Sequence, residues 1–413
     1  MTTVTPDGRA TARHKKEQEM RHKTTRTRGR IPQVGALVAA VVLALVATGC
    51  GSSGSSGSSS STAGTSDEAK QALEAAYTGD TGTPPTKSTT PKSGVTAWVI
   101  SCGQSVPSCV TPTKAIVEAA KAVGWTAKIC DGKLSPDGWG TCMDQATSSG
   151  ADVVFPVGID CASIQKPFQE ATKAGVAIVG AGGADCTSTG GKTSYMATER
   201  LELSKASDQF ETWWKNAGKT VADYLIGSTD AKAKVLELKF TSPVWGPWLT
   251  EGFEAEIKTC SGCEIVGSVD IANEDFGTTS AVDKFTAALQ KYTDANAVYV
   301  PVGGWMTQGF ASAVKSSGRM DDLVVASGFG DESTMDLIRK GDQGLNAALG
   351  YATTWGSYGS VDEAIRVLNG EDPVVEGDGY QMVDADHNMP SSGDYVGGDV
   401  DYKAKYLKLW GVS

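Results

Sequence analysis

The sequence predicts an α/β protein whose folded part consists of two similar lobes, each built on a doubly wound parallel sheet. Short apolar runs alternate along the chain with amphipathic stretches of ten or more residues, which is the pattern typical of βαβ units. The alternation occurs twice, and a long helical pattern over 201–225 separates the two series. The run ADVVFPVG at 151–158 returns as ANAVYVPVGG at 295–304, each as the third strand of its series. This repetition predicts two lobes of similar construction.

Each series is expected to alternate strictly between strands and helices. The first begins with TAWVISC, an apolar run bounded by turn residues, and its helices end at the glycines Gly124, Gly150 and Gly175. The expected elements of the first series are strands over 96–102, 126–130, 151–158 and 176–183 and helices over 111–124, 137–150 and 163–174. Those of the second series are strands over 233–240, 264–271, 295–304 and 323–330 and helices over 246–259, 279–292, 306–317 and 332–340.

Two parallel sheets in one chain predict where a ligand would bind. Ligands of open α/β sheets bind in the crevice outside the carboxyl ends of the strands. Two such sheets that face each other form a cleft, and hinge motion can close it around a small molecule. We therefore expect the functional residues in the loops that follow the strands.

The N-terminal region has the features of an export signal. Residues 1–30 contain nine Lys and Arg against three acidic residues, and the apolar stretch Val34–Val46 is 13 residues long, too short for a spanning helix of about 20. Ala47-Thr48-Gly49-Cys50 resembles the bacterial lipobox, which predicts a lipoprotein signal peptide over 1–49 and lipidation of Cys50. A plain signal peptide cut nearby is the alternative, and either Met1 or Met20 could be the start.

The residues after the lipobox are expected to form a tether and an acidic globular body. The Gly/Ser-rich stretch within 50–93 predicts a flexible linker. Removing the nine basic and three acidic residues of 1–49 from totals of 37 and 48 leaves 28 and 45, a net charge of −17. This charge argues against nucleic-acid binding, which needs a basic surface.

Eight cysteines follow Cys50, and an even number in an exported protein predicts disulfides. Eight cysteines allow 105 connectivities, of which pairing between sequence neighbours is the preferred prediction. Zinc binding or a thioredoxin-like redox role remains the alternative for the CxxC motif Cys260-Ser-Gly-Cys263. The expected pairs are Cys102–Cys109, Cys130–Cys142, Cys161–Cys186 and Cys260–Cys263.

The sequence gives little support for catalysis. Of its three histidines, His14 and His22 lie in the signal region, which leaves His387. The chain contains no GxSxG, HExxH or Walker A motif. We therefore expect no catalytic residue, no metal and no cofactor.

The whole pattern resembles type I periplasmic binding proteins of the ribose and sugar-binding class, over about 95–413. The order of elements, a crossing near 195–198, the segment LNAALGYATTWGSYGSVDEAIRVLNG and the ending DYKAKYLKLWG carry the resemblance. It implies two lobes joined by a multi-strand hinge, with lobe 1 over 94–196 plus 352–380 and lobe 2 over 197–351 plus 381–413. It also implies a monomer outside the cell membrane that delivers a solute to an ABC permease.

The positions that match the family's ligand residues depart from its usual polar set. Pro247 occupies the position of a ligand-binding Arg, Gly303 and Gly304 replace an Asn-Asp pair, and Tyr351 replaces a Gln at the hinge. Aromatic residues with few charges among them indicate a neutral sugar-like ligand held between indole rings. A receptor coupled to a sensor kinase, or a binding protein for an amino acid or an aromatic compound, stays open as an alternative. The candidate ligand-binding residues are Gln104, Asp160, Asp185, Trp245, Trp248, Trp305, Asp331, Tyr351 and Trp355.

Overall fold

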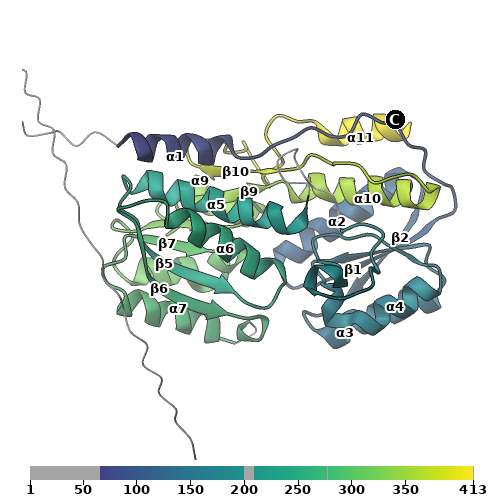
Figure 1. The fold of residues 1–413 in the computed structure, drawn as a ribbon, viewed down its shortest axis with the longest axis horizontal. Coiled ribbons are helices and arrows are strands. Elements are labelled where there is room, and N and C mark those ends of the chain that lie inside the picture. Colours follow the sequence, from purple (N-terminus) through teal and green to yellow (C-terminus); the bar gives the residue numbers. More distant parts are fainter. Residues whose placement is uncertain (1–65, 200–208, 277, 413) are drawn as a thin grey trace, which may run out of the picture. The chain divides into compact units, whose positions relative to one another are not determined.

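A computed structural model describes residues 66–199, 209–276 and 278–412 (Figure 1). The predicted signal peptide, the lipidation site Cys50 and the first part of the predicted tether lie outside these residues. In the part of the chain that is described, no helix is both long and apolar enough to cross a bilayer.

The first sheet has four parallel strands in the order β2-β1-β3-β4. Its order places β1 in the centre, as in a doubly wound sheet, so the helices that follow the strands lie on its two faces. The elements of this sheet are β1 (Thr96–Ser101), β2 (Thr126–Asp131), β3 (Val153–Val157) and β4 (Ala177–Ile178), with helices α2 (Pro107–Ala122), α3 (Pro136–Ser148) and α4 (Gln165–Lys173).

Alternating side chains of β1 divide the first lobe into two cores. Ala97 and Val99 belong to the same buried cluster as Ile116 of α2, whereas Ile100 belongs to a second cluster with Met143 of α3. Successive residues of a strand point to opposite faces of its sheet. The apolar run TAWVIS is therefore buried on both sides, as a central parallel strand requires.

The second sheet has six strands in the order β10-β9-β8-β7-β5-β6. Only the edge strand β10 is antiparallel, to β9, and the other pairs are parallel. Two separate α/β sheets confirm the predicted fold class. The elements are β5 (Lys234–Phe240), β6 (Glu264–Ile271), β7 (Ala297–Val300), β8 (Val324–Ser327), β9 (Ala347–Tyr351) and β10 (Tyr380–Asp384), with helices α5 (Phe210–Ser228), α6 (Trp245–Ile257), α7 (Ser280–Lys291), α8 (Ala311–Ser316) and α9 (Glu332–Lys340).

Several element boundaries differ from the prediction for local reasons. Helix α2 begins at Pro107 rather than at 111, because proline is accommodated at the first helical position, where no amide hydrogen is needed. The helix predicted over 306–317 is interrupted, since Met306–Phe310 form a π turn in which Gly309 has a φ of 118°. The first residues of the helix predicted over 201–225 lie outside the described part.

The last part of the predicted tether is ordered, which corrects the expectation of a flexible linker up to residue 93. Helix α1 (Asp67–Thr78) begins at Ser66, whose hydroxyl accepts a hydrogen bond from the Ala69 amide at 3.1 Å. It buries Ala69 and Ala76 and lies alongside α5 (Figure 1). The chain then pairs Asp80 with Tyr380, at the start of β10. The tether prediction thus remains only for 50–65.

The C-terminal region crosses back to the first lobe. Helix α10 (Thr353–Asn369) packs on α2, where the Tyr358 hydroxyl donates to Glu118 at 2.9 Å. Helix α11 (Tyr402–Trp410) packs on α10, and the Trp410 indole donates to Asp362 at 2.7 Å. The prediction assigned all of 381–413 to lobe 2, but α11 belongs with α10 because its aromatic residues are buried there.

All four predicted disulfides are present between sequence neighbours. The Cα atoms of the pairs are 5.0 to 5.7 Å apart, within the usual range for such bonds. Because Cys260 and Cys263 are joined to each other, the zinc alternative lacks its thiolate ligands in this structure.

Two buried carboxyl groups lie in the cores of the lobes. Glu237 on β5 is fully buried beside Lys239, whose ammonium is 3.4 Å away, and burial raises the pKa of Glu237 from 4.5 to about 7. Glu363 on α10 is fully buried and accepts a hydrogen bond from the Val374 amide at 2.7 Å. Burial also raises its pKa from 4.5 to about 7.

These carboxyl groups should make the fold more stable in mild acid than at neutral pH. Their raised pKa values mean that only the unfolded chain releases the two protons between about pH 4.5 and pH 7. The free energy of unfolding should therefore fall as pH rises across that window, by up to about 3 kcal/mol for each group. Denaturant unfolding of Glu237→Gln should show a shallower pH dependence, with exposed Glu264→Gln as the control. An unchanged slope in Glu237→Gln would contradict this assignment.

Candidate functional site

The carboxyl ends of all nine parallel strands border one cavity of about 180 Å³. The cavity therefore lies where the topology of two parallel sheets predicts a ligand. Each of these strands contributes a lining residue at its last position or in the loop that follows. In the first sheet these residues are Cys102, Leu134, Val157 and Ala181. In the second sheet they are Phe240, Asn273, Val302, Phe329 and Tyr351.

Aromatic rings form most of the second-lobe wall and hold one another in place. The Trp214 and Trp245 rings stack with centroids 4.5 Å apart and an interplanar angle of 17°. Trp305 meets Phe240 edge to face, with centroids 5.0 Å apart. Such offset and edge-to-face pairs are the favoured arrangements of aromatic rings. The wall is therefore rigid before any ligand arrives.

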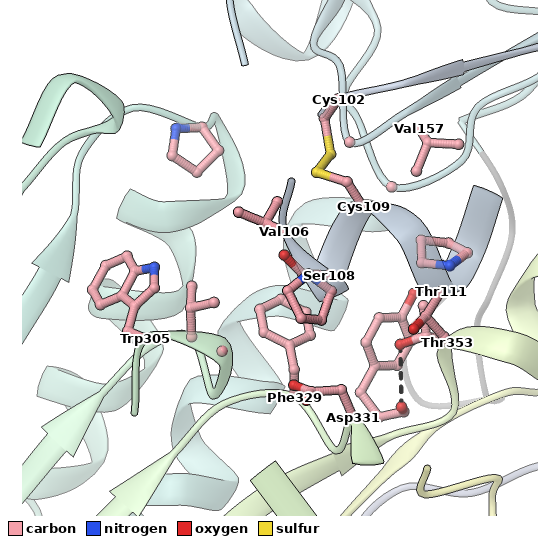
Figure 2. Close-up of a pocket in the computed structure, with 18 of the residues that line it drawn as sticks. Cys102, Val106, Ser108, Cys109, Thr111, Val157, Trp305, Phe329, Asp331 and Thr353 are labelled. Carbon is pink, nitrogen blue, oxygen red and sulfur yellow. Dashed lines mark hydrogen bonds between the residues drawn. A yellow bond between two sulfur atoms is a disulfide. The ribbon is translucent and has the colours of Figure 1, made fainter. Parts of the chain in front are cut away.

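A disulfide forms part of the first-lobe wall. The Cys102–Cys109 bond joins the end of β1 to the start of α2, and Figure 2 shows it beside Val106 with Phe329 across the cavity. The Cys102 carbonyl accepts hydrogen bonds from the Leu134 amide at 2.7 Å and from the Trp139 indole at 2.9 Å. The disulfide therefore fixes the loop between β1 and α2, and the Cys102 carbonyl ties this loop to the one between β2 and α3.

Two lining residues have an unusual backbone conformation. Leu134 has a φ of 54° and Phe329 a φ of 56°. A bulky residue in this left-handed region costs free energy, and such residues persist where the surrounding structure holds them, often at functional sites. Both place a large apolar side chain on the cavity wall.

The charge of the lining favours a neutral ligand. Among the described residues that border the cavity, none is Lys, Arg or His. Of the two carboxylates, Asp331 caps α9 by accepting hydrogen bonds from the Thr334 amide at 3.2 Å and its hydroxyl at 2.8 Å. Asp394 accepts one from the Glu332 amide at 2.6 Å, and burial raises its pKa. The cavity thus offers no cation to an anionic ligand.

The structure brings together some of the predicted ligand residues. Trp245, Trp305, Asp331 and Tyr351 border the cavity. Asp160 borders an adjoining space that opens from the same cavity.

The other four candidates have different positions. Trp355 is buried in the core, where its indole donates to the Glu376 carbonyl at 3.0 Å. Asp185 accepts hydrogen bonds from the Met196 and Tyr195 amides at 2.8 and 2.9 Å. Trp248 packs edge to face on Phe210, and Gln104 donates to the Ser101 hydroxyl at 2.6 Å. None of these four borders the cavity in the described structure.

Asp160 connects the two lobes directly. One carboxylate oxygen accepts a hydrogen bond from the Ala184 amide of its own lobe at 2.8 Å. The other accepts one from the Val244 amide, in the loop between β5 and α6, at 2.9 Å. The carboxyl group is buried, and this burial raises its pKa. The contact can form only while the lobes are close together.

The sequence analysis missed several lining residues. The signal for Phe240 and Phe329 was their place at or just after the carboxyl end of a predicted strand. Trp139 and Trp214 lie within helices, and no local pattern distinguishes a helical Trp at a cavity from one in a core. Phe276 lies in the loop before α7, and no local pattern identified it as a lining residue either.

Two sheets whose strand ends meet at one cleft are the construction of a two-lobed solute-binding protein. The family model described as periplasmic binding protein domain matches residues 99–372. The chain therefore belongs to this family. No curated protein matches it.

Solved structures with the same fold include three proteins of low sequence identity. One is a periplasmic solute-binding protein of an ABC transporter from Actinobacillus succinogenes 130z, with bound D-allose, which is 16% identical and has a TM-score of 0.59. The alignment with it covers 70% of this chain and 97% of the chain of that protein. GanP, a glucose-galactose binding protein from Geobacillus stearothermophilus, is 18% identical with a TM-score of 0.58 and covers 71% and 99%. The Caulobacter myo-inositol binding protein is 15% identical with a TM-score of 0.59 and covers 71% and 94%.

The Asp160 contact should influence how often the ligand-free lobes are closed. In Asp160→Asn the amide nitrogen faces one of the two backbone donors, so one hydrogen bond is lost at a cost of about 1–3 kcal/mol. Small-angle X-ray scattering should therefore give a larger radius of gyration for the ligand-free variant than for the wild type. Asp152→Asn is the control, because Asp152 accepts a hydrogen bond from the Thr96 amide within one lobe. Equal radii for Asp160→Asn and the wild type would show that the contact does not hold the lobes together.

Proposed function

We propose that this protein is an extracytoplasmic solute-binding lipoprotein that captures a small, neutral, sugar-like molecule between its lobes and delivers it to an ABC permease. The observation that carries the proposal is the cavity at the carboxyl ends of both sheets, which is lined by aromatic rings and has no cationic residue among the described lining residues. Binding, and no chemical reaction, is the activity.

The lining suits a ring with apolar faces. Indole and phenol rings present flat apolar faces, and an indole adds one hydrogen-bond donor at its edge. Trp245 and Trp305 both border the cavity, and each of them contacts the Phe240 ring edge to face. The three structural relatives described above are solute-binding proteins whose titles name D-allose, glucose and galactose, and myo-inositol, all neutral hydroxylated rings.

Closure of the lobes supplies the mechanism. A ligand shifts the equilibrium between open and closed forms only by its differential affinity for them. A ligand in the cavity touches loops of both sheets, so it favours the closed form. The Asp160–Val244 hydrogen bond adds a contact that exists only after closure. The stacked rings and the disulfide reduce the entropy lost on binding, because these walls are already ordered.

Anchoring by a lipid on Cys50 would keep the protein near its permease. Acyl chains hold a protein on a membrane surface without a spanning segment. The Gly/Ser-rich residues after Cys50 would let it reach a membrane partner while the short tether raises the local concentration. The ordered helix α1 sets the end of this tether on the second lobe.

The aromatic residues give a direct test once a thermal-shift screen of sugars, polyols and nucleosides has identified a ligand. Trp245→Ala and Trp305→Ala should each weaken binding at least about tenfold, since each removes a ring face worth more than about 1.4 kcal/mol. Isothermal titration calorimetry measures the affinity. Trp248→Ala is the matched control, because Trp248 lies on the same helix as Trp245 but outside the cavity lining. Unchanged affinity in both cavity variants would remove the proposed binding site.

A further inference from the structure

A second, larger space adjoins the aromatic cavity. It has a volume of about 1060 Å³ and shares part of its lining with the cavity, including Val106, Leu134, Pro243, Phe276 and Gln308. We call the aromatic space the inner cavity and the adjoining one the outer compartment. Because the two share walls from both lobes, they form one continuous cleft with two parts.

The outer compartment differs from the inner cavity in its chemistry. Most of the residues that it adds are exposed and polar, Pro136 and the buried Asp160 being the exceptions, and both lobes contribute them. Four of these side chains make no hydrogen bond or ion pair with any residue of the described structure: Ser105, Lys133, Ser163 and Glu274. Ser242 and Thr307, on the second lobe, add two hydroxyl groups, of which the first accepts a hydrogen bond from the Asn273 amide at 2.8 Å and the second donates one to the Gly304 carbonyl at 3.0 Å. Free donors and acceptors on two facing lobes are the groups that a hydroxylated ligand requires.

The loop between the two parts has a fixed and strained backbone. Lys133 and Leu134 are consecutive residues with φ of 54° each. The Asp131 carboxylate accepts hydrogen bonds from the Lys133 and Gln104 amides, each at 3.0 Å. This arrangement places Lys133 on the outer compartment and Leu134 on the boundary of both spaces. Such strain in a loop that is held by its neighbours is characteristic of ligand sites.

The inner cavity alone is poorly suited to a fully hydroxylated sugar. Its walls are mainly aromatic and aliphatic, with Cys102–Cys109 and Val106 facing Phe329 (Figure 2), and Ser108, Thr111 and Gln308 are among the few polar side chains that also border it. The carboxylates Asp331 and Asp394 already accept hydrogen bonds from the protein. A buried hydroxyl without a partner costs about 1–3 kcal/mol. A sugar with hydroxyls on every side would need more polar partners than this mainly apolar wall supplies, whereas a ring with few polar groups would not.

We propose that the outer compartment is a second subsite and that the natural solute is a glycoside. Its apolar ring occupies the inner cavity, and its hydroxylated sugar unit occupies the outer compartment, which Ser163 and Lys133 border from the first lobe and Ser242, Glu274 and Thr307 border from the second. This inference rests on the proposed function and specifies its substrate class. Because the sugar unit touches both lobes, it also contributes to their closure.

Matched probes test the two parts separately. Calorimetric titrations would compare phenyl β-D-glucopyranoside and phenyl β-D-galactopyranoside with D-glucose, D-galactose, myo-inositol and phenol. At least one phenyl glycoside should bind tenfold or more tightly than both its free sugar and phenol. If a free sugar or inositol binds as tightly as the glycosides, the second subsite is wrong and the proposed function stands. If none of the probes binds, both proposals fail.

Variants of the outer compartment locate the sugar unit. Lys133→Ala and Ser163→Ala should each weaken binding of the preferred phenyl glycoside at least threefold, because each removes a hydrogen-bonding group from the outer compartment alone. Lys173→Ala, an exposed lysine that borders neither space, is the control and should bind as the wild type does. Affinity unchanged in both outer variants would place the sugar unit elsewhere and overturn the subsite.

Discussion

The direction of the strands is the constraint on which the rest of this structure depends. Nine strands in two sheets point in the direction of a parallel neighbour, β10 being the one antiparallel strand among those described, and the carboxyl end of each of the nine contributes to the lining of one cavity. In a parallel sheet, the loops that follow the strands all lie at one edge. The direction of the strands alone therefore brings the loops of each lobe together. Two such edges that face each other then produce a site that exists only while both lobes contribute.

Rigidity is the property that the cavity walls share. The Cys102–Cys109 bond, the stacked pair Trp214–Trp245 and the left-handed Phe329 each fix a side chain by a different means. A wall that is ordered before binding loses little entropy when the ligand arrives. More of the free energy of binding is then left to favour the closed form of the lobes. The Asp160 carboxylate also stabilises this form through its hydrogen bond to the other lobe.

The sequence predicted the sheets and the disulfides well but only part of the site. Apolar runs and glycine stops are local signals, and cysteines close in sequence were close in space. Trp245 and Trp248 lie on the same helix, but only Trp245 borders the cavity, and their difference depends on how α6 packs. Trp355 follows a strand end as expected, but it faces the core between α10 and α11. Helix α1 was missed although the Ser66 cap, the acidic Asp67 and Glu68 and the stop at Gly79 are local signals for it, because all of 50–93 was assigned to the Gly/Ser-rich linker.

The central claim is that a neutral solute is held between the two lobes in the aromatic cavity. A crystal structure of the complex with the tightest-binding probe tests it most directly. The account predicts electron density for the solute in contact with Trp245 and Trp305 of the second lobe and with the Cys102–Cys109 loop of the first. Density that touches only one lobe, or that lies outside the space bordered by these residues, would contradict it.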